Sequence, residues 1–340
     1  MKILVLSNRD INTWQLFGED IFIRRLSETL NVFNSEVTLT TENNYKAFRK
    51  PNVVILNNVS FFKYGFYFKR LGCKVVAPLY FSWNNDSNFL ENFKSLAGDV
   101  INQAFVDKYI VTHERLLKEF SIKGVKKSKL HLIEPYYYCQ YCDPSHMNLK
   151  GKFRDLESEV RLVYIGSISP VRVPLKNILR ELKKLNKLKV SFKLYSTRIV
   201  PDEPITKDLN YRKGNVEISI IPKKLSEAEK HEVLSSSHFF LFTPNGNVTM
   251  NPSMSLLEAV YHLAVPIVSD KLSGSEYLPK VNVVKNTNQI ASRIIQTREL
   301  LMKDNYPLEA LLNSFSRFYN EKRFLHQVKN LIEELKCTKQ

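Results

Sequence analysis

The chain has 340 residues, of which 44% are hydrophobic and 25% charged, and its formal net charge at pH 7 is +16. This length predicts about two domains, and this composition excludes intrinsically disordered and collagen-like chains. No apolar run is long enough for a membrane-spanning helix, and the apolar start at Ile3–Leu6 is too short for a signal peptide, so we expect a cytoplasmic protein. The basic excess favours anionic partners such as nucleotides, lipid phosphates or nucleic acid.

Short β-branched runs recur along the first half, separated by segments with helical or turn-like patterns. These runs are Lys2–Ser7, Glu36–Thr41, Val53–Leu56, Lys74–Leu79, Lys108–Thr112 and Leu130–Glu134. Several are continuously apolar, which is typical of parallel strands covered on both faces. A helical stripe of apolar residues starting at Phe22 follows the first run, and Gly18 stands just before it. The pattern predicts a βα unit whose helix N-terminus faces a ligand.

The segment Phe61–Arg70 interleaves aromatic and basic residues and contains no acidic residue. Such a composition suits a membrane interface, with aromatic rings among acyl chains and Lys63, Lys69 and Arg70 at lipid phosphates. The same rings would also fit a helix that packs beneath the first sheet. The first interpretation predicts docking on an anionic membrane surface, and the second predicts an ordinary core helix.

The four cysteines are too few for a disulfide scaffold, which agrees with a reducing compartment. Cys139, Cys142 and His146 supply part of a zinc ligand set, but no second ligand pair follows at a suitable spacing. Ordinary thiols are the simpler interpretation, so we predict no metal site. Whether Cys139 and Cys142 bind metal or pair with each other stays open.

A second series of strand-like runs follows a polar stretch from about Cys142 to Ser158, which we interpret as a linker. The strand-like runs are Val160–Ile165, Lys189–Tyr195, Val216–Ile221, His238–Phe242 and Val265–Ser269, and helical patterns lie near Leu175–Leu188, Ser226–Ser236, Ser255–Leu263, Gln289–Leu301 and Leu308–Leu335. We predict an α/β fold of two doubly wound Rossmann-like domains, residues 1–150 and 151–340, with parallel sheets facing across a cleft. The last helix is free to pack back toward the first domain.

A Gly/Asn/Pro/Ser loop precedes the helical pattern that contains Glu258. Asn251, Pro252 and Ser253 are residue types that begin helices, and free amides at a helix N-terminus bind anions such as a diphosphate. Glu258 follows about two turns into the helix, where its carboxylate would accept hydrogen bonds from two ribose hydroxyls. A solvated glutamate on an amphipathic helix explains these residues equally well.

The order and spacing of these segments resemble the retaining glycosyltransferases of family 4 (glycosyltransferase group 1), which have the two-domain GT-B fold. The family's Glu-Ala and Gly-x-Pro-Val-Val motifs correspond here to Leu257–Ala259 and Ala264–Val268. Further segments are similar to the family: Met1–Ser7 with Gly18-Glu19, Glu36–Thr40, Lys108–Thr112 and Val163–Arg172. The resemblance therefore covers nearly the whole chain.

The resemblance implies roles for individual residues. Glu258 would bind the donor ribose, and Arg172, in place of the family's lysine, would neutralise the leaving diphosphate with its two-pronged guanidinium. The implied donor-binding residues are Gly18, Gly166, Ser167, Arg172, Asn247, Asn251, Ser253, Met254 and Glu258, with Arg172 and Glu258 as the catalytic pair. No cofactor or metal ion is implied, since the nucleotide-sugar is a co-substrate.

Three positions depart from the family pattern. Ser167 replaces an arginine, Met250 replaces the first glutamate of the paired-glutamate motif, and Tyr80 stands nearest to the family's N-domain histidine. A thioether cannot replace a carboxylate that binds sugar hydroxyls, although the amide of Asn247 or Asn251 could.

The resemblance implies a metal-independent hexosyltransferase (EC 2.4) that transfers a sugar from a nucleotide-sugar to a glycan or polyprenyl-linked glycan with retention. We expect it in the cytoplasm, peripheral on the cytoplasmic face of the membrane. One alternative is a catalytically inactive GT-B-like binding protein, motivated by Met250 and Ser167. The other is a nucleic-acid-binding protein, motivated by the net charge alone, since no nucleic-acid module signature is present.

Overall fold

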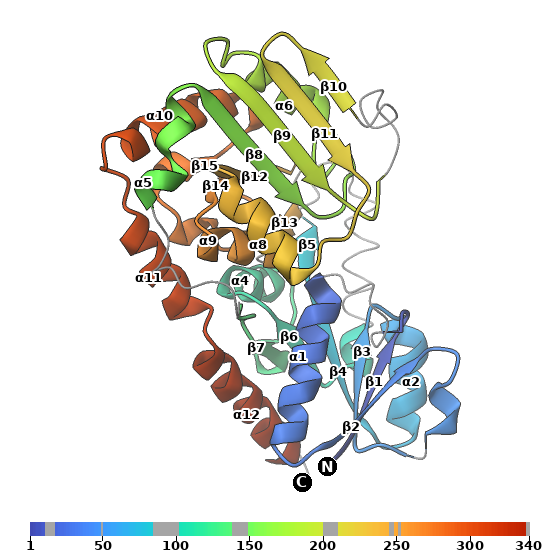
Figure 1. Cartoon of the computed structure of the whole chain (residues 1–340). Helices are drawn as coiled ribbons and strands as arrows, with labels where there is room; N and C mark the ends of the chain where they lie inside the picture. The colour runs from blue at the N-terminus through green and yellow to red at the C-terminus, as the bar shows by residue number, and fades with distance from the viewer. Residues whose placement is uncertain are drawn as a thin grey trace. The chain divides into compact units, whose positions relative to one another are not determined.

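The computed structural model describes residues 1–10, 18–48, 50–83, 102–137, 149–199, 210–244, 248–250 and 253–337. The chain divides into two compact units, each built on a parallel sheet with helices packed against it (Figure 1). The first unit comprises Met1–Tyr136, Thr249–Asn251 and Tyr319–Gln340, and the second comprises Tyr137–Val248 and Pro252–Phe318. The predicted α/β class with two doubly wound, Rossmann-like parallel sheets is confirmed.

The first unit contains a six-stranded parallel sheet in the order β2-β1-β3-β4-β6-β7. Its strands are β1 (Lys2–Ser7), β2 (Glu36–Thr41), β3 (Val53–Asn57), β4 (Lys74–Leu79), β6 (Lys108–Val111) and β7 (Leu130–Leu132), and its helices are α1 (Gly18–Val32), α2 (Phe61–Arg70), α4 (Glu114–Ile122) and α12 (Glu321–Cys337). A short strand β5 (Phe81–Trp83) pairs with β13 (Val248–Met250) outside this sheet. Each predicted strand of the first half is present.

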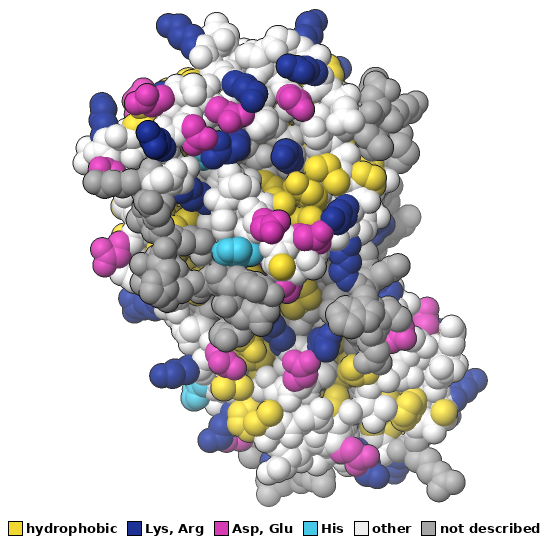
Figure 2. Space-filling view, in the orientation of Figure 1, with side chains coloured by type: hydrophobic (Ala, Val, Ile, Leu, Met, Phe, Trp, Pro, Cys, Tyr) yellow, Lys and Arg dark blue, Asp and Glu magenta, His cyan; other side chains and the backbone are white. Residues whose placement is uncertain are grey.

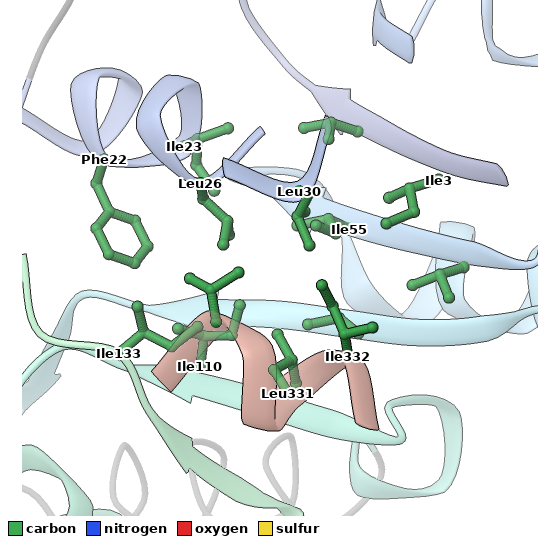
Figure 3. Close-up of a cluster of buried hydrophobic side chains, with 14 of the residues drawn as sticks. Ile3, Phe22, Ile23, Leu26, Leu30, Ile55, Ile110, Ile133, Leu331 and Ile332 are labelled. Carbon is green, nitrogen blue, oxygen red and sulfur yellow. The ribbon is translucent and has the colours of Figure 1, made fainter. Parts of the chain in front are cut away.

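Apolar side chains fill both faces of this sheet because consecutive residues of a strand point to opposite sides. Ile3 and Val5 of β1 belong to one buried cluster, and Leu4 and Leu6 belong to another. The first cluster lies under α1 and α12, whose side chains converge on the strands in Figure 3. The second lies under α2 and α4.

The C-terminal helical segment differs from its prediction as one helix over Leu308–Leu335. The structure has two helices, α11 (Leu308–Phe318) in the second unit and α12 in the first. Asn320 separates them, because its side-chain oxygen accepts a hydrogen bond from the backbone N–H of Arg323 at 2.9 Å, as a helix N-cap does. Gln327 then ties α12 to Glu134, whose backbone N–H donates to the Gln327 side chain at 2.8 Å.

The second unit contains a seven-stranded sheet in the order β10-β11-β9-β8-β12-β14-β15. Its strands are β8 (Glu159–Ile165), β9 (Lys189–Tyr195), β10 (Asn210–Lys213), β11 (Val216–Ile221), β12 (Phe239–Phe242), β14 (Val265–Ser269) and β15 (Val283–Val284), and its helices are α5 (Leu149–Lys152), α6 (Leu175–Leu182), α8 (Glu227–Ser236), α9 (Met254–Tyr261), α10 (Ile290–Met302) and α11. Only the edge strand β10 pairs in an antiparallel way among the described ladders of this sheet.

Strand order fixes where each unit can bind a ligand. In the second unit the chain runs outward from β8 to β9 and β11 on one side, and then through β12 and β14 on the other. Such a reversal leaves a crevice outside the carboxyl ends of the two central strands. The same reversal occurs between β1 and β3 in the first unit. No helix in the described part of the chain has the length and apolar composition that crossing a membrane requires.

Candidate functional site

The loop after β8 begins at Gly166, one of the predicted donor-binding residues. Its backbone φ is 154°, which L side chains rarely adopt, and an added Cβ would lie 2.7 Å from the hydroxyl of Tyr164. The backbone N–H of Gly166 also donates to the carbonyl of Tyr195 at 3.0 Å. A glycine is therefore required for the chain to leave the sheet at this point.

We expect Gly166→Ala to lower the free energy of unfolding by about 2 kcal/mol or more, because strain at positive φ adds to the clash with Tyr164. Gly214 is a matched control, since its φ is +61° and an added Cβ would meet nothing within 4 Å. Gly214→Ala should therefore cost only about 1 kcal/mol. Urea unfolding measures both variants, and removal of the clashing hydroxyl by Tyr164→Phe should restore part of the loss in Gly166→Ala.

Tyr164 holds this loop against the end of the strand. Its ring is buried, and its hydroxyl donates to the backbone carbonyl of Ser167 at 3.0 Å. Burial raises the pKa of Tyr164 to about 12, against the opposing effect of the neighbouring Arg172 guanidinium. Ser167, where the resembling family would have an arginine, thus contributes its backbone to the loop fold.

Arg172 lies at the far end of the same loop and is half-buried. Its backbone N–H donates to the carbonyl of Ser169 at 3.0 Å and to the Ser169 hydroxyl at 3.3 Å. These bonds fold the loop back, so the Arg172 guanidinium comes beside the Tyr164 hydroxyl at the carboxyl end of β8. The loop thereby presents a permanent positive charge at the predicted crevice.

The N-terminus of α9 lies next to the end of β8. Ser253 is the N-cap, and its side chain accepts a hydrogen bond from the N–H of Leu256 at 3.2 Å. Met254 is the first helical residue, and the hydroxyl of Ser255 donates to the carbonyl of Ile165 at 2.7 Å. The predicted helix start is thus shifted to Ser253, and this N-terminus is bonded directly to the strand that precedes Gly166.

Glu258 lies inside α9 and is only 3% exposed. Its Oε1 atom is 2.8 Å from Nζ of Lys230 on α8, and the same ammonium group is 2.8 Å from Oε1 of Glu227. Burial opposes the charge of Lys230, but the two carboxylates outweigh that effect and raise its pKa. Glu258 is therefore a buried, ion-paired carboxylate rather than the solvated residue of the alternative interpretation.

A group of histidines continues this polar layer between α8 and α9. The Nδ1 atoms of His231 and His262 are 3.3 Å apart, and Nε2 of His262 is 3.3 Å from the Tyr137 hydroxyl. Burial, together with His231 and two nearby lysines, lowers the pKa of His262 to about 3. His262 is thus neutral at physiological pH. Among the described residues, no group of side chains has the composition of a metal site.

Lys152 of α5 lies at the C-terminal ends of these two helices. Its ammonium group donates to the carbonyl of His262 at 2.8 Å and to that of Leu234 at 3.1 Å. Burial, reinforced by Arg161, lowers the pKa of Lys152 to about 7. A cation at helix C-termini satisfies exposed carbonyl groups, so this contact stabilises the packing of α8 and α9.

Gly18, the remaining described donor-binding candidate, belongs to the first unit and is the first residue of α1. The acidic residues that follow it, Glu19 and Asp20, are each 3.3 Å from a guanidinium nitrogen of Arg9. Glu19 also accepts a hydrogen bond from Asn58 at 3.0 Å. These two acids of the first helical turn thus form ion pairs just beyond the carboxyl end of β1, and Glu19 also contacts the residue that follows β3.

The structure brings five predicted residues together in the second unit. Gly166, Ser167 and Arg172 lie in the loop after β8, while Ser253 and Met254 begin the helix bonded to that strand. Asn247, Asn251, Cys139, Cys142 and His146 lie outside the described residues, as does the side chain of Met250.

Sequence reasoning missed three residues of this site: Tyr164, Lys230 and Ser255. Tyr164 near the end of β8 and Ser255 in the first turn of α9 stand beside recognised motifs, where a polar side chain is a usable signal. Lys230 precedes Glu258 by 28 positions, and no local pattern connects the two.

Solved structures share this fold over nearly the whole chain. HepE from Anabaena in complex with UDP-glucose matches with a TM-score of 0.71 at 10% identity, over 98% of this chain and 99% of that chain. An α,α-trehalose-phosphate synthase (UDP-forming) from Burkholderia vietnamiensis matches with a TM-score of 0.68 at 10% identity, over 99% of each chain. The lipopolysaccharide outer core galactosyltransferase WaaB matches with a TM-score of 0.63 at 12% identity, over 98% of this chain and 99% of that chain.

The chain has the GT-B fold. No protein-family model matches its sequence, and no curated protein matches it either. The similarity therefore lies in the two parallel sheets and their crossover helices. In the second unit of this GT-B fold, the loop Gly166–Arg172 and the N-terminus of α9 occupy the switch point between β8 and β12.

Proposed function

We propose that this protein is a glycosyltransferase that uses a nucleotide-sugar donor. The observation that carries the proposal is the contact between Ser255 and Ile165, which sets a helix N-terminus beside the loop that bears Arg172. A helix N-terminus and an arginine at a topological switch point form a site for a diphosphate. UDP-glucose is bound by HepE, which has the same fold, so a UDP-sugar is the donor class to test first.

In this proposal each residue has a separate task. The free N–H groups at the start of α9 bind the diphosphate, and Glu258 accepts hydrogen bonds from the ribose hydroxyls. Arg172 stabilises the negative charge that grows on the leaving diphosphate as the sugar–phosphate bond breaks. Because an arginine supplies this charge, the proposed reaction requires no metal ion.

The proposed chemistry is transfer of a hexose with retention of configuration. The acceptor hydroxyl attacks the anomeric carbon on the face that the diphosphate leaves, and its proton passes to the departing phosphate. The bond to the phosphate oxygen breaks as the new glycosidic bond forms, so the products are the glycoside and UDP. A glycan or polyprenyl-linked glycan is the proposed acceptor, which fits a neighbour named as a lipopolysaccharide outer core galactosyltransferase.

Calorimetric titration with UDP, GDP, CDP and dTDP tests the donor site, and release of UDP from UDP-sugars tests turnover. We expect UDP to bind with at least tenfold preference over the other diphosphates and at least one UDP-hexose to be consumed. Binding without consumption of any donor, with or without a glycan extract, would favour the inactive binding protein. If none of the four nucleotides bound, the proposed donor site would be wrong.

The surface of α2 supports a membrane-associated acceptor. Tyr64 and Phe68 are buried under the sheet, whereas Phe62 and Phe66 are 56% and 46% exposed. The core-helix interpretation thus holds for one face of the helix, and the proposed membrane contact depends on the other, exposed face. Phe105 contacts both exposed rings, with centroid distances of 5.4 and 5.8 Å.

Basic side chains border this aromatic patch. Lys63 is exposed, and Arg70 lies over the Phe66 ring at 5.5 Å. Lys69 is 2.6 Å from Asp107, which makes it an ion-pair partner as well as a basic residue of this surface. We propose that this surface, with Lys63, Lys69 and Arg70, docks on anionic membrane at the cytoplasmic face, because aromatic rings and cations together favour such an interface.

Replacement of Lys63 and Arg70 by Glu should abolish flotation with vesicles that contain anionic lipid, since each basic residue contributes about 1 kcal/mol near such a surface. Lys69 is left in place because its loss would leave Asp107 without that partner. The control variant replaces Lys187 and Lys303, which are exposed on the second unit, by Glu. Wild-type protein that ignored anionic vesicles at low salt would contradict membrane docking and favour a soluble acceptor.

The face of the molecule drawn in Figure 2 gives no support for nucleic-acid binding. Figure 2 shows Lys and Arg side chains spread over the visible face, where they alternate with acidic side chains. A nucleic-acid surface would instead concentrate basic residues in one stripe or patch.

A further inference from the structure

Helices α8 and α9 lie side by side, and one lysine connects them (Figure 1). Lys230 comes from the middle of α8 and reaches Glu258 in α9 at 2.8 Å. The Lys230 side chain is only 13% exposed and that of Glu258 only 5%. Both charges are therefore withdrawn from water, which is rare unless the partners compensate each other.

A buried carboxylate without a cation becomes protonated at higher pH than usual, because burial penalises its charged form. A protonated carboxyl would bind ribose hydroxyls less well, since hydrogen bonds to a charged acceptor are roughly twice as strong as neutral ones. The Lys230 ammonium opposes this effect and also restricts the rotamer of Glu258. Lys230 is itself fixed from the solvent side by Glu227, whose side chain is 56% exposed.

We infer that Lys230 is a positioning residue of the donor site, which keeps Glu258 ionised and oriented toward the nucleotide ribose. The inference rests on the proposed role of Glu258 in nucleotide binding. Lys230 does not touch the substrate in this scheme, and it acts through Glu258 alone.

Other titratable groups surround this pair, and their effects on the pH dependence of UDP affinity have to be distinguished from that of Glu258. They are Glu227 and His231 on α8, His262 directly after α9, Lys152 on α5, and Tyr137. His262 stays neutral because its pKa is lowered to about 3, whereas Lys152 has a pKa of about 7 and titrates in the physiological range. A pH series must therefore include a variant that lacks the Glu258 carboxylate.

The test measures UDP affinity of the full chain by calorimetry between pH 6.5 and 9. Lys230→Met should bind UDP roughly 10- to 30-fold more weakly than wild type at pH 6.5, the effect of losing charge assistance in two hydrogen bonds. The difference from wild type should shrink as pH rises and Glu258 loses its proton. Lys230→Arg, which keeps the charge, should restore most of the affinity.

The double variant Lys230→Met/Glu258→Gln isolates the mechanism, because a glutamine cannot ionise. Its UDP affinity should equal that of Glu258→Gln, and the recovery at high pH should be absent. UDP and Lys152 ionise in the same way in all these variants, so they do not cause the differences between them. A recovery that persisted in the double variant would show that another group titrates, and it would overturn the inference.

Lys184→Met is the matched control for lost stability. Lys184 on the second unit is 2.6 Å from Oε1 of Glu181, a glutamate with a side chain only 1% exposed. This variant also removes the lysine from a buried glutamate, so it should lower the unfolding temperature without weakening UDP binding. An equal loss of UDP affinity in Lys184→Met would assign the effect to general destabilisation and overturn the inference.

The two proposals fail in different ways. If Glu258→Gln binds UDP as tightly as wild type, Glu258 is not in the donor site and that part of the proposed function is wrong. If Glu258→Gln loses affinity while Lys230→Met binds like wild type at every pH, only the role of Lys230 is wrong.

Discussion

Glu258→Ala should weaken UDP binding by at least about 100-fold, because it removes two charge-assisted hydrogen bonds to the ribose, each of about 1.5–3 kcal/mol. The variant should also be less stable, since Lys230 then keeps only its partly exposed partner Glu227. Calorimetry with UDP, at a temperature well below the unfolding midpoint of the variant, separates the two effects.

Glu227→Ala is the control for this result. It removes the other carboxylate of Lys230, but that side chain is 56% exposed and lies outside the proposed donor contacts. We expect its UDP affinity to stay within about threefold of wild type, as surface ion pairs contribute little. Equal UDP affinities of wild type and Glu258→Ala would exclude Glu258 from the donor site.

Arg172→Ala should reduce kcat for UDP release by about 100- to 1,000-fold, with a smaller effect on KM. Its guanidinium faces a diphosphate that gains charge mainly in the transition state, and such an interaction affects turnover more than ground-state binding. Lysine at this position keeps the charge but not the two-pronged geometry, so Arg172→Lys should restore part of the activity.

Arg180→Ala provides the comparison for Arg172→Ala. Arg180 is an exposed arginine of α6 in the same unit, and it donates to the Asn288 side chain at 2.9 Å. Its loss should leave kcat unchanged. If Arg172→Ala instead raised KM at constant kcat, Arg172 would be a binding residue and the proposed stabilisation of the leaving group would be wrong.

The α2 segment shows why composition alone does not tell which aromatic residues are buried. Helical spacing places Tyr64 and Phe68 on the buried face and Phe62 and Phe66 on the exposed one. Composition alone cannot divide aromatic residues between these faces, because phenylalanine occurs on both. The position of the sheet relative to the helix makes the division.

Sequence by itself determined the parallel sheets of this protein, because continuously apolar β-branched runs are stable only as strands covered on both faces. It also located the helix that carries Glu258, since helix-capping residues act over a few neighbouring positions. Gly166 was predicted from the resemblance of Val163–Arg172 to a family segment.

Only the tertiary structure decided the interactions that join distant segments. The break at Asn320 assigns α11 and α12 to different units, although the apolar pattern of both is helical. The pairing of Lys230 with Glu258 and the bond from Ser255 to Ile165 depend on which helices and strands become neighbours in the sheet order. Local propensity reports only on nearby residues, whereas burial of a charge and its compensation depend on every element packed around it.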